Sequence, residues 1–197
     1  MEATVTRYHH GDLRAALVEA SFGLIAECGL QRFSVAEVAR RAGVSSAAPY
    51  RHFPDRAHLL GAVSAVAARD LRTEIEGAAD DAGGDPKARL AAAAGAYVQC
   101  VGVTGAGMSV IFAAELYEIA DDKRRDETRA LMTTLLDLAW AATDAGTHAD
   151  AVRLMEATLA IAHGYATLYR EGFFAARDRA LDEIADRAVE AAAALLD

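Results

Sequence analysis

The 197-residue chain lacks the features that mark several classes of protein. It has only two cysteines, Cys28 and Cys100, which are too few for a disulfide framework. Because both lie in apolar helical patterns, we interpret them as buried thiols, with a redox pair as the alternative. Three prolines oppose helix formation, and no segment alternates β-branched with polar residues as a strand would. Residues 1–10 contain no apolar run, so we expect no signal peptide and a cytoplasmic protein.

Charge is missing from residues 90–114, a stretch long enough to span a bilayer. It is rich in Ala and Gly, however, and it is interrupted between Gly102 and Gly107. We therefore expect two buried helices that meet at this break, and no interaction with a membrane.

Alanine is abundant instead, with 48 residues, and 53% of the chain is hydrophobic. Alanine is the strongest helix former, so the composition predicts an all-α fold with a sizeable core. Apolar periodicity and stop signals predict about nine helices. They cover about 12–28, 34–42, 46–52, 56–79, 87–103, 107–120, 123–145, 149–171 and 178–196. The Gly- and Asp-rich segment 77–86 is the clearest linker, and it divides residues 1–76 from 87–197.

Residues 34–53, SVAEVARRAGVSSAAPYRHF, have the pattern of a helix-turn-helix. Ser34 and Glu37 are spaced as a capping box, and Gly43 suits a turn that needs a positive φ. Ser45 can then cap a short second helix. In such a unit the second helix enters the major groove of DNA, where small residues allow close approach and polar ones supply donors.

The same segment resembles the DNA-binding domain of TetR-family transcriptional regulators over about residues 8–75. The resemblance rests on the capping box, on Ala-Arg-Arg-Ala-Gly-Val-Ser and on Tyr-Arg-His-Phe-Pro-Asp-Arg. Residues 8–14 and the Ala-Ala-Pro before Tyr50 are similar to a subgroup with a Trp…His-Gly signature in its second domain. Here His163-Gly164 match that signature, whereas Leu159 stands in place of the Trp.

The resemblance implies contacts to double-stranded operator DNA from two sets of residues. Backbone contacts would come from Ser34, Tyr50, His52 and Arg56, and groove contacts from Ser45, Ser46, Ala47 and Arg51. We add Arg41 to the candidates, although Arg40 and Arg41 could be solvated helix charges. Phe53 and Val44 are expected in the core. Pro49 departs from the family pattern and removes a backbone donor, so we expect a short or distorted recognition helix.

Residues 87–197 resemble the regulatory domain of the family, which implies sensing of a small-molecule effector and formation of a homodimer. The candidate pocket residues are Tyr97, Cys100, Met108, Ile111, Phe112, Glu115, Leu131, Leu135, Trp140 and His163. A buried Glu115 could select a cationic ligand, and an exposed helix charge is the alternative. The candidate dimer residues are Leu154, Leu159, Ala162, Ala166, Leu181, Ile184, Ala188, Ala192 and Leu195. Packing of these stripes within one chain is the alternative.

The net charge of −9 opposes DNA binding only when it is averaged over the whole chain. Residues 1–60 hold 7 Arg and 6 acidic residues, whereas residues 61–197 hold 13 basic and 23 acidic residues. The expected function is therefore a DNA-binding regulator, a ligand-responsive repressor that binds a palindromic operator as a dimer.

Two other classes of protein stay open at this point. One is an all-helical enzyme or ligand carrier that holds a helix-turn-helix, and the other is an adaptor that has lost DNA binding. We expect no enzymatic activity, no cofactor and no metal site, because no His, Cys or carboxylate spacing suits a metal. The pair His9-His10 is the one alternative metal site.

Overall fold

The computed structural model describes residues 13–143, 146–175 and 179–196. The predicted sites at residues 8–12, with His9 and His10, lie outside these ranges. The described residues contain no strand, so the prediction of an all-α fold is confirmed. The α-helices are α1 Leu13–Cys28, α2 Val35–Arg41, α3 Arg56–Asp81, α4 Pro86–Thr104, α5 Met108–Ile111, α6 Asp122–Ala142, α7 His148–Arg170 and α8 Leu181–Ala193. Three 3₁₀ turns accompany them: η1 Leu30–Arg32, η2 Pro49–Arg51 and η3 Ala114–Glu118.

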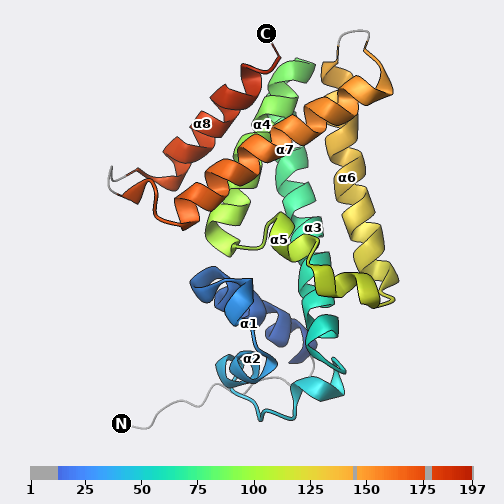
Figure 1. Ribbon diagram of the computed structural model, residues 1–197, viewed down its shortest axis with the longest axis vertical. Helices are drawn as coiled ribbons and strands as arrows, with labels where there is room; N and C mark the ends of the chain where they lie inside the picture. The colour runs from blue at the N-terminus through green and yellow to red at the C-terminus, as the bar shows by residue number, and fades with distance from the viewer. Residues whose placement is uncertain (1–12, 144–145, 176–178, 197) are drawn as a thin grey trace.

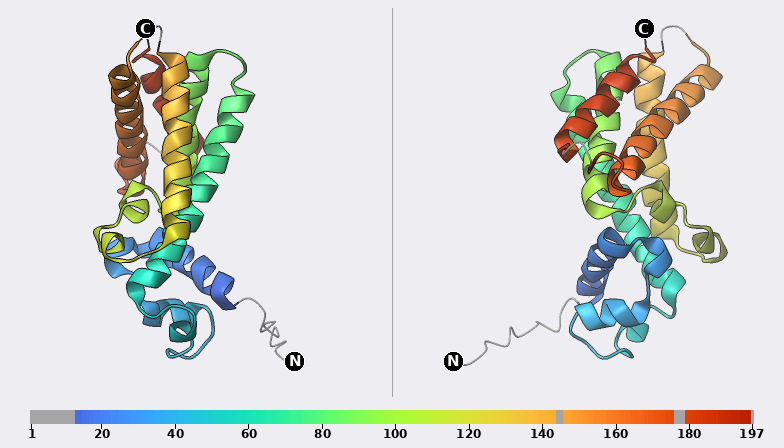
Figure 2. Two further views of the ribbon diagram at one scale, coloured as in Figure 1. Left: turned by 90° about the vertical axis from the view of Figure 1, so that its right-hand side faces the viewer. Right: turned by 60° about the vertical axis from the view of Figure 1, so that its left-hand side comes forward.

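The helices form two parts that α3 joins (Figure 1). We call α1, α2, η2 and the first turns of α3 the head. The remainder of α3 and the elements from α4 to α8 are the body. In Figure 2, α3 leaves the head and continues alongside α4 and α6 of the body. A single helix therefore links the predicted helix-turn-helix to the second half of the chain.

The predicted helix-turn-helix boundaries are largely confirmed. Ser34 caps α2, because its Oγ accepts a hydrogen bond from the Glu37 N–H at 3.2 Å. The other half of the capping box is wrong, since the Glu37 carboxylate pairs with Arg40 and Arg41 instead. Gly43 has a φ of 69°, as the expected turn requires.

The segment after this turn is distorted, as Pro49 predicts. The backbone from Ser45 to His52 makes i→i+3 hydrogen bonds, and only Pro49–Arg51 forms a 3₁₀ turn. The predicted full helix over 46–52 is therefore wrong. Its physical reason is that Pro49 has no N–H to donate to the Ser45 carbonyl, which accepts from Ala48 instead.

Two other helix predictions need correction. The expected helix 107–120 divides into α5 and η3, because Ser64 Oγ donates to the Ile111 carbonyl at 3.0 Å and occupies a helical acceptor. Residues 77–81, predicted as linker, complete α3, since Ala79 is fully buried in the body. Asp85 then caps α4, and Pro86 occupies its first turn.

The core of the body surrounds α4. Its fully buried face includes Leu90, Ala94, Tyr97 and Val98, and it packs against α3, α6, α7 and α8. Small residues bring these helices close, since a Cβ added at Gly95 would lie 2.7 Å from Val189 Cγ2 on α8. The alanine-rich composition therefore serves close helix packing here.

No single helix in the described ranges is long and apolar enough to cross a membrane. Helix α4 and the segment Met108–Glu118 reach that length only together, and they are bent by 72°. Both contribute buried residues to the body, as the break between Gly102 and Gly107 predicts.

Candidate DNA-binding surface

Seven of the nine candidate DNA contacts lie exposed at the free end of the head, which is the lower end in Figure 1. They come from the start of α2 and from the segment between α2 and α3. These residues are Ser34, Ser45, Ser46, Ala47, Tyr50, Arg51 and His52. We call them the tip residues. Tyr50 is 55% exposed, so it does not belong to the core, which was the alternative for this residue.

Two buried residues fix the orientation of the tip. Pro49 is buried, and Phe53 is 2% exposed, as predicted for the core. The Arg14 guanidinium lies 4.9 Å from the centre of the Phe53 ring, in a cation–π contact that joins α1 to this segment. Because Pro49 and Phe53 point inward, the three residues between them are left on the surface. This arrangement presents a phenol, a guanidinium and an imidazole together, which suits contacts with phosphates and base edges.

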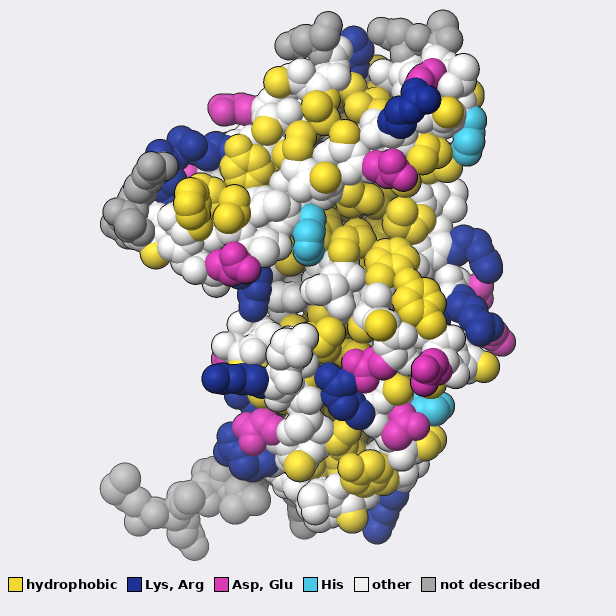
Figure 3. Space-filling model, viewed as in Figure 1, with side chains coloured by type: hydrophobic (Ala, Val, Ile, Leu, Met, Phe, Trp, Pro, Cys, Tyr) yellow, Lys and Arg dark blue, Asp and Glu magenta, His cyan; other side chains and the backbone are white. Residues whose placement is uncertain are grey.

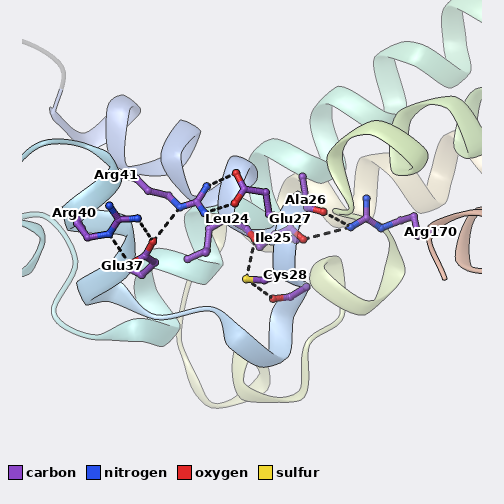
Figure 4. A network of polar contacts seen from close by, with 10 residues as sticks. Leu24, Ile25, Ala26, Glu27, Cys28, Glu37, Arg40, Arg41 and Arg170 are labelled. Atoms are coloured by element: carbon purple, nitrogen blue, oxygen red, sulfur yellow. Dashed lines mark hydrogen bonds and ion pairs between the residues drawn. The ribbon is translucent and has the colours of Figure 1, made fainter. Parts of the chain in front are cut away.

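Arg41 is placed differently from the tip residues. Its guanidinium donates to the Glu27 carboxylate of α1, with Nη1 at 2.7 Å from Oε1, and also to Glu37 at 3.4 Å (Figure 4). The hydrogen bond with Glu27 raises the pKa of Arg41. The hydrogen bond from Arg40 lowers the pKa of Glu37 to about 2. Arg41 therefore holds α2 against α1.

Arg56 also makes contacts within the protein. Its Nε donates to the Phe33 carbonyl at 3.2 Å and its Nη2 to the Leu30 carbonyl at 3.3 Å. Its Nη1 forms an ion pair with Glu115 of η3. These contacts fasten the start of α3 to the head and, through Glu115, to the body.

The candidate pocket residues do not gather around one cavity. Tyr97, Ile111, Leu131 and Leu135 are at most 2% exposed and form part of the core. Cys100 and Met108 are partly buried beside it. Glu115 is 34% exposed and paired with Arg56, so it is not the buried carboxylate that would select a cation.

The remaining candidates for the pocket are Trp140, Phe112 and His163. Trp140 is 52% exposed near the end of α6, where its ring centre is 6.2 Å from that of His148. Phe112 is 37% exposed. His163 Nδ1 is 2.9 Å from the Tyr97 hydroxyl, which accepts a hydrogen bond from the Met108 N–H at 3.1 Å.

The candidate dimer residues also need correction. Five of them are at most 1% exposed within the single chain: Ala162, Ala166, Ile184, Ala188 and Ala192. They belong to the core, where α8 packs against α4 and α7, so their side chains cannot also contact a second copy. Leu154, Leu159 and Leu181 are partly buried, and Leu195 is 45% exposed.

Sequence reasoning missed Arg170 at the end of α7. Its Nη2 donates to the carbonyls of Ile25 at 3.4 Å and Ala26 at 2.8 Å, at the end of α1 (Figure 4). Its Nη1 donates to the Gly102 carbonyl of α4 at 3.3 Å. A cation suits helix C-terminal carbonyls, so Arg170 caps two helices and joins head to body. A basic residue in a last turn is the only local signal for this role.

The residues described contain no group of three His, Cys, Asp or Glu side chains that could hold a metal ion. In the head, Arg40 and Arg41 pair with Glu37 and Glu27, whereas Arg56 pairs with Glu115 of the body. The surface view in Figure 3 shows arginine and lysine side chains distributed over the head as well as the body.

The sequence of this chain is similar to those of known transcriptional regulators. A sequence model of the tetR family of bacterial regulatory proteins matches residues 17–63, which cover α1, α2, the tip and the start of α3. The chain is also 31% identical over 121 residues to the HTH-type transcriptional regulator BetI of Stenotrophomonas maltophilia. That match covers 59% of this chain and 62% of BetI, so it spans less than two thirds of the curated relative.

Solved structures extend the likeness over nearly the whole chain. A protein of unknown function from Rhodococcus sp. RHA1 is 31% identical, with a TM-score of 0.72, and the match covers 95% of this chain and 97% of the other. A transcriptional regulator from the same organism is 23% identical, with a TM-score of 0.65 and coverage of 93% and 95%. The family match falls on the helix-turn-helix itself, and it identifies residues 17–63 as a DNA-binding domain of the tetR family of bacterial regulatory proteins.

Proposed function

We propose that this chain is a ligand-responsive repressor that binds a palindromic DNA operator as a homodimer through its tip residues. The observation that carries the proposal is the exposure of Tyr50, Arg51 and His52 at one end of the molecule, beside Ser34 at the start of α2. Free N–H groups at the start of a helix and a nearby hydroxyl suit a phosphate, and an exposed Arg suits a phosphate or a guanine. Arg41 and Arg56 then act as positioning residues.

The dimer surface of this proposal is the outward face of α7. The five predicted dimer residues that are buried within the chain no longer belong to it. In their place the face carries Ala160 and Leu168, which are exposed, and Ile161, which is partly exposed. A Cβ at Gly164 would meet nothing within 4 Å, so the middle of this face is open. Figure 3 shows hydrophobic side chains along α7 where it crosses the upper front of the molecule.

Two copies are needed because a palindromic operator has two half-sites. Their centres lie about 34 Å apart or at a related spacing, and one head reaches only one of them. The acidic remainder of the chain, with 23 acidic against 13 basic residues in 61–197, would repel DNA and restrict contact to the two heads.

The effector would act on the contacts that join head and body. Besides α3 itself, these contacts include Arg56 with Glu115 and Arg170 with the end of α1. A ligand that binds one arrangement of these contacts better than another shifts the spacing of the two heads by its differential affinity. The division into a DNA-binding unit, residues 1–76, and a regulatory unit, residues 87–197, belongs to the same proposal, as does a cytoplasmic location.

The test uses fluorescence anisotropy with labelled duplexes that cover the DNA upstream of the gene for this chain. We expect one duplex to bind two copies of the protein, with an affinity that falls steeply as salt rises. A scrambled duplex of the same composition is the control. Equal affinity for both duplexes would contradict the proposal, and a single bound copy measured by sedimentation would contradict its dimer.

A further inference from the structure

A cleft of about 440 Å³ lies between η3 and the first half of α6, on the side of the body near the head. Its apolar lining comes from Phe112, Tyr117 and Met132. Phe112 is 37% exposed and Tyr117 is 71% exposed, so two large aromatic side chains face solvent beside each other in this lining. The volume lies in the range of small-molecule sites, which is roughly 300–1,000 Å³.

The cleft also contains a buried cation. Arg124 is 8% exposed, and its Nη2 donates to the Leu116 carbonyl at 3.0 Å. No carboxylate of residues 13–143, 146–175 or 179–196 forms an ion pair with it. Its Nε and the hydroxyl of Thr128, which also lines the cleft, are buried and have no hydrogen-bond partner among those same residues. A buried guanidinium without an anion is costly, so this group is suited to an anion that the chain itself does not supply.

The other two arginines of the cleft do not share this property. Arg125 pairs with Asp122 at 3.2 Å, and Arg129 pairs with Asp126 at 3.1 Å. Each of these ion pairs is neutral overall and largely exposed to water. The uncompensated positive charge of the cleft is therefore that of Arg124.

We propose that this cleft binds a small carboxylate with an apolar aromatic or acyl body. The inference rests on the proposed function and identifies its effector site. A carboxylate matches the planar fork of a guanidinium, and a hydroxyl beside it supplies one further hydrogen bond. The apolar body of the ligand covers Phe112, Tyr117 and Met132. A buried Glu115 could have selected a cationic ligand instead, but this carboxylate is partly exposed and paired with Arg56.

The position of the cleft links the ligand to the head. Arg124 donates to the carbonyl of Leu116, and the preceding residue, Glu115, pairs with Arg56. A carboxylate that draws the Arg124 guanidinium toward itself competes with the Leu116 carbonyl and moves η3. The ligand thereby changes the Arg56–Glu115 contact and the seating of the head on the body.

The test compares three compounds that share one apolar body. Isothermal titration of the full chain without DNA uses 4-phenylbutyrate, 4-phenylbutanol and 4-phenylbutylamine, with decanoate as an acyl carboxylate and inorganic phosphate as an anion without a body. We expect the two carboxylates to bind at least about tenfold more tightly than the alcohol, the amine or phosphate. If the alcohol binds as tightly as the carboxylates, the role of Arg124 is overturned. If phosphate binds as tightly as they do, the role of the apolar residues Phe112, Tyr117 and Met132 is overturned.

Variants locate the site. Arg124→Gln should lower carboxylate affinity by about tenfold or more, and Tyr117→Ala by several-fold. Because Arg124 is buried and its variant could unfold, Tyr117→Ala is the second reporter, since Tyr117 is 71% exposed. Arg153→Gln on α7 makes the same charge change outside the cleft and is the matched control. If Tyr117→Ala leaves carboxylate affinity as unchanged as Arg153→Gln does, the proposed site is overturned. It is also overturned if neither carboxylate binds to the wild-type protein.

DNA affinity measured without any ligand is independent of these titrations. Specific DNA binding together with no carboxylate binding contradicts only the cleft. Carboxylate binding without specific DNA binding contradicts only the repressor. The two proposals therefore fail separately.

Discussion

Arg56 and Glu115 form an ion pair although they are 59 positions apart in the chain. The sequence suggested a DNA contact for Arg56 and a ligand contact for Glu115. The structure joins the two side chains at the junction of head and body instead. Each side chain is about one third exposed, at 36% and 34%, so water screens the pair in part. The contact is suited to adjusting how the head sits on the body, because it contributes little to overall stability.

Removing this ion pair should have a small effect on stability and a larger effect on regulation. For Glu115→Gln we expect a loss of about 0–1 kcal/mol in the free energy of unfolding, because partly exposed ion pairs contribute about that much. The effect of a bound effector on DNA affinity should fall. Urea unfolding and DNA titrations with and without effector measure the two quantities.

A double-mutant cycle with Arg56→Gln isolates the ion pair from the hydrogen bonds that Arg56 makes to Phe33 and Leu30. The matched control is the cycle of Arg129→Gln with Asp126→Asn, a pair whose side chains are 74% and 71% exposed. A coupling energy between Arg56 and Glu115 no larger than that of the control would contradict their proposed role.

Arg170 should matter more for stability than Arg56. Arg170→Gln removes hydrogen bonds to the carbonyls of Ile25, Ala26 and Gly102, which leaves the ends of α1 and α4 without this cap. We expect a loss of about 1–3 kcal/mol in urea unfolding, because the partly buried carbonyls of Ala26 and Gly102 lose a charged donor, while that of Ile25 keeps the Gly29 N–H. Hydrogen exchange should accelerate at the end of α1. A loss equal to that of Arg153→Gln, an exposed arginine of the same helix, would argue against this role.

Two glycine-to-alanine substitutions should act in opposite directions. Gly95→Ala places a Cβ 2.7 Å from Val189 Cγ2 and 3.5 Å from the Ala185 carbonyl, so either the Val189 side chain must shift or α4 and α8 must separate. We expect it to destabilise the chain by about 1–3 kcal/mol. A Cβ at Gly77, in α3, meets nothing within 4 Å, and this substitution should stabilise by about 0.5–1 kcal/mol through helix propensity. Thermal unfolding compares them, and a shift of the same sign in both would refute the packing of α8 on α4.

The local features of the fold were predictable because neighbouring residues determine them. Ser34 caps α2, Gly43 takes a positive φ, and Pro49 shortens the helical segment in which it lies, each for reasons present within a few positions. The exposure of the tip also follows from this local pattern. The family resemblance added the functional meaning of these residues.

Features that depend on distant partners were not predictable in this way. The stripe of Ile184, Ala188 and Ala192 suits a dimer interface and an internal helix contact equally well, and only the position of α4 decides between them. Arg170 and Arg124 carry no local pattern that names their partners, which lie on other elements. The division of 107–120 depends on Ser64, which is 47 positions from Ile111.

Alkaline pH should destabilise the body through Tyr97, which is buried, and Cys100, which is partly buried. Burial raises the pKa of Tyr97 to about 12 and that of the Cys100 thiol to about 11. The unfolded chain loses these protons at lower pH, near about 10 for Tyr and 8.5 for Cys. The stability they contribute is therefore complete below about pH 8.5, and it is lost as the pH rises toward 11 and 12.

Urea unfolding between about pH 8 and pH 11 measures this loss. Cys100→Ala should reduce the slope of stability against pH across that range, since it removes one of the two protons. A slope that is the same in the wild type and in this variant would show that the Cys100 thiol titrates at its ordinary value.

The central claim is that the tip residues bind DNA while Arg41 and Arg56 position them. Its most direct test is the dissociation constant of the protein–operator complex, measured against salt, for the wild type, Arg51→Gln and Arg153→Gln. If Arg51 contacts a base, we predict that Arg51→Gln weakens binding by about 1–3 kcal/mol. If Arg51 contacts a phosphate, the variant should reduce the salt slope, which is the slope of the logarithm of affinity against the logarithm of salt concentration, by about 1. Arg153→Gln should leave both quantities unchanged. If Arg51→Gln folds normally and binds the operator as Arg153→Gln does, with the same salt slope, the assignment of the DNA-binding surface is contradicted.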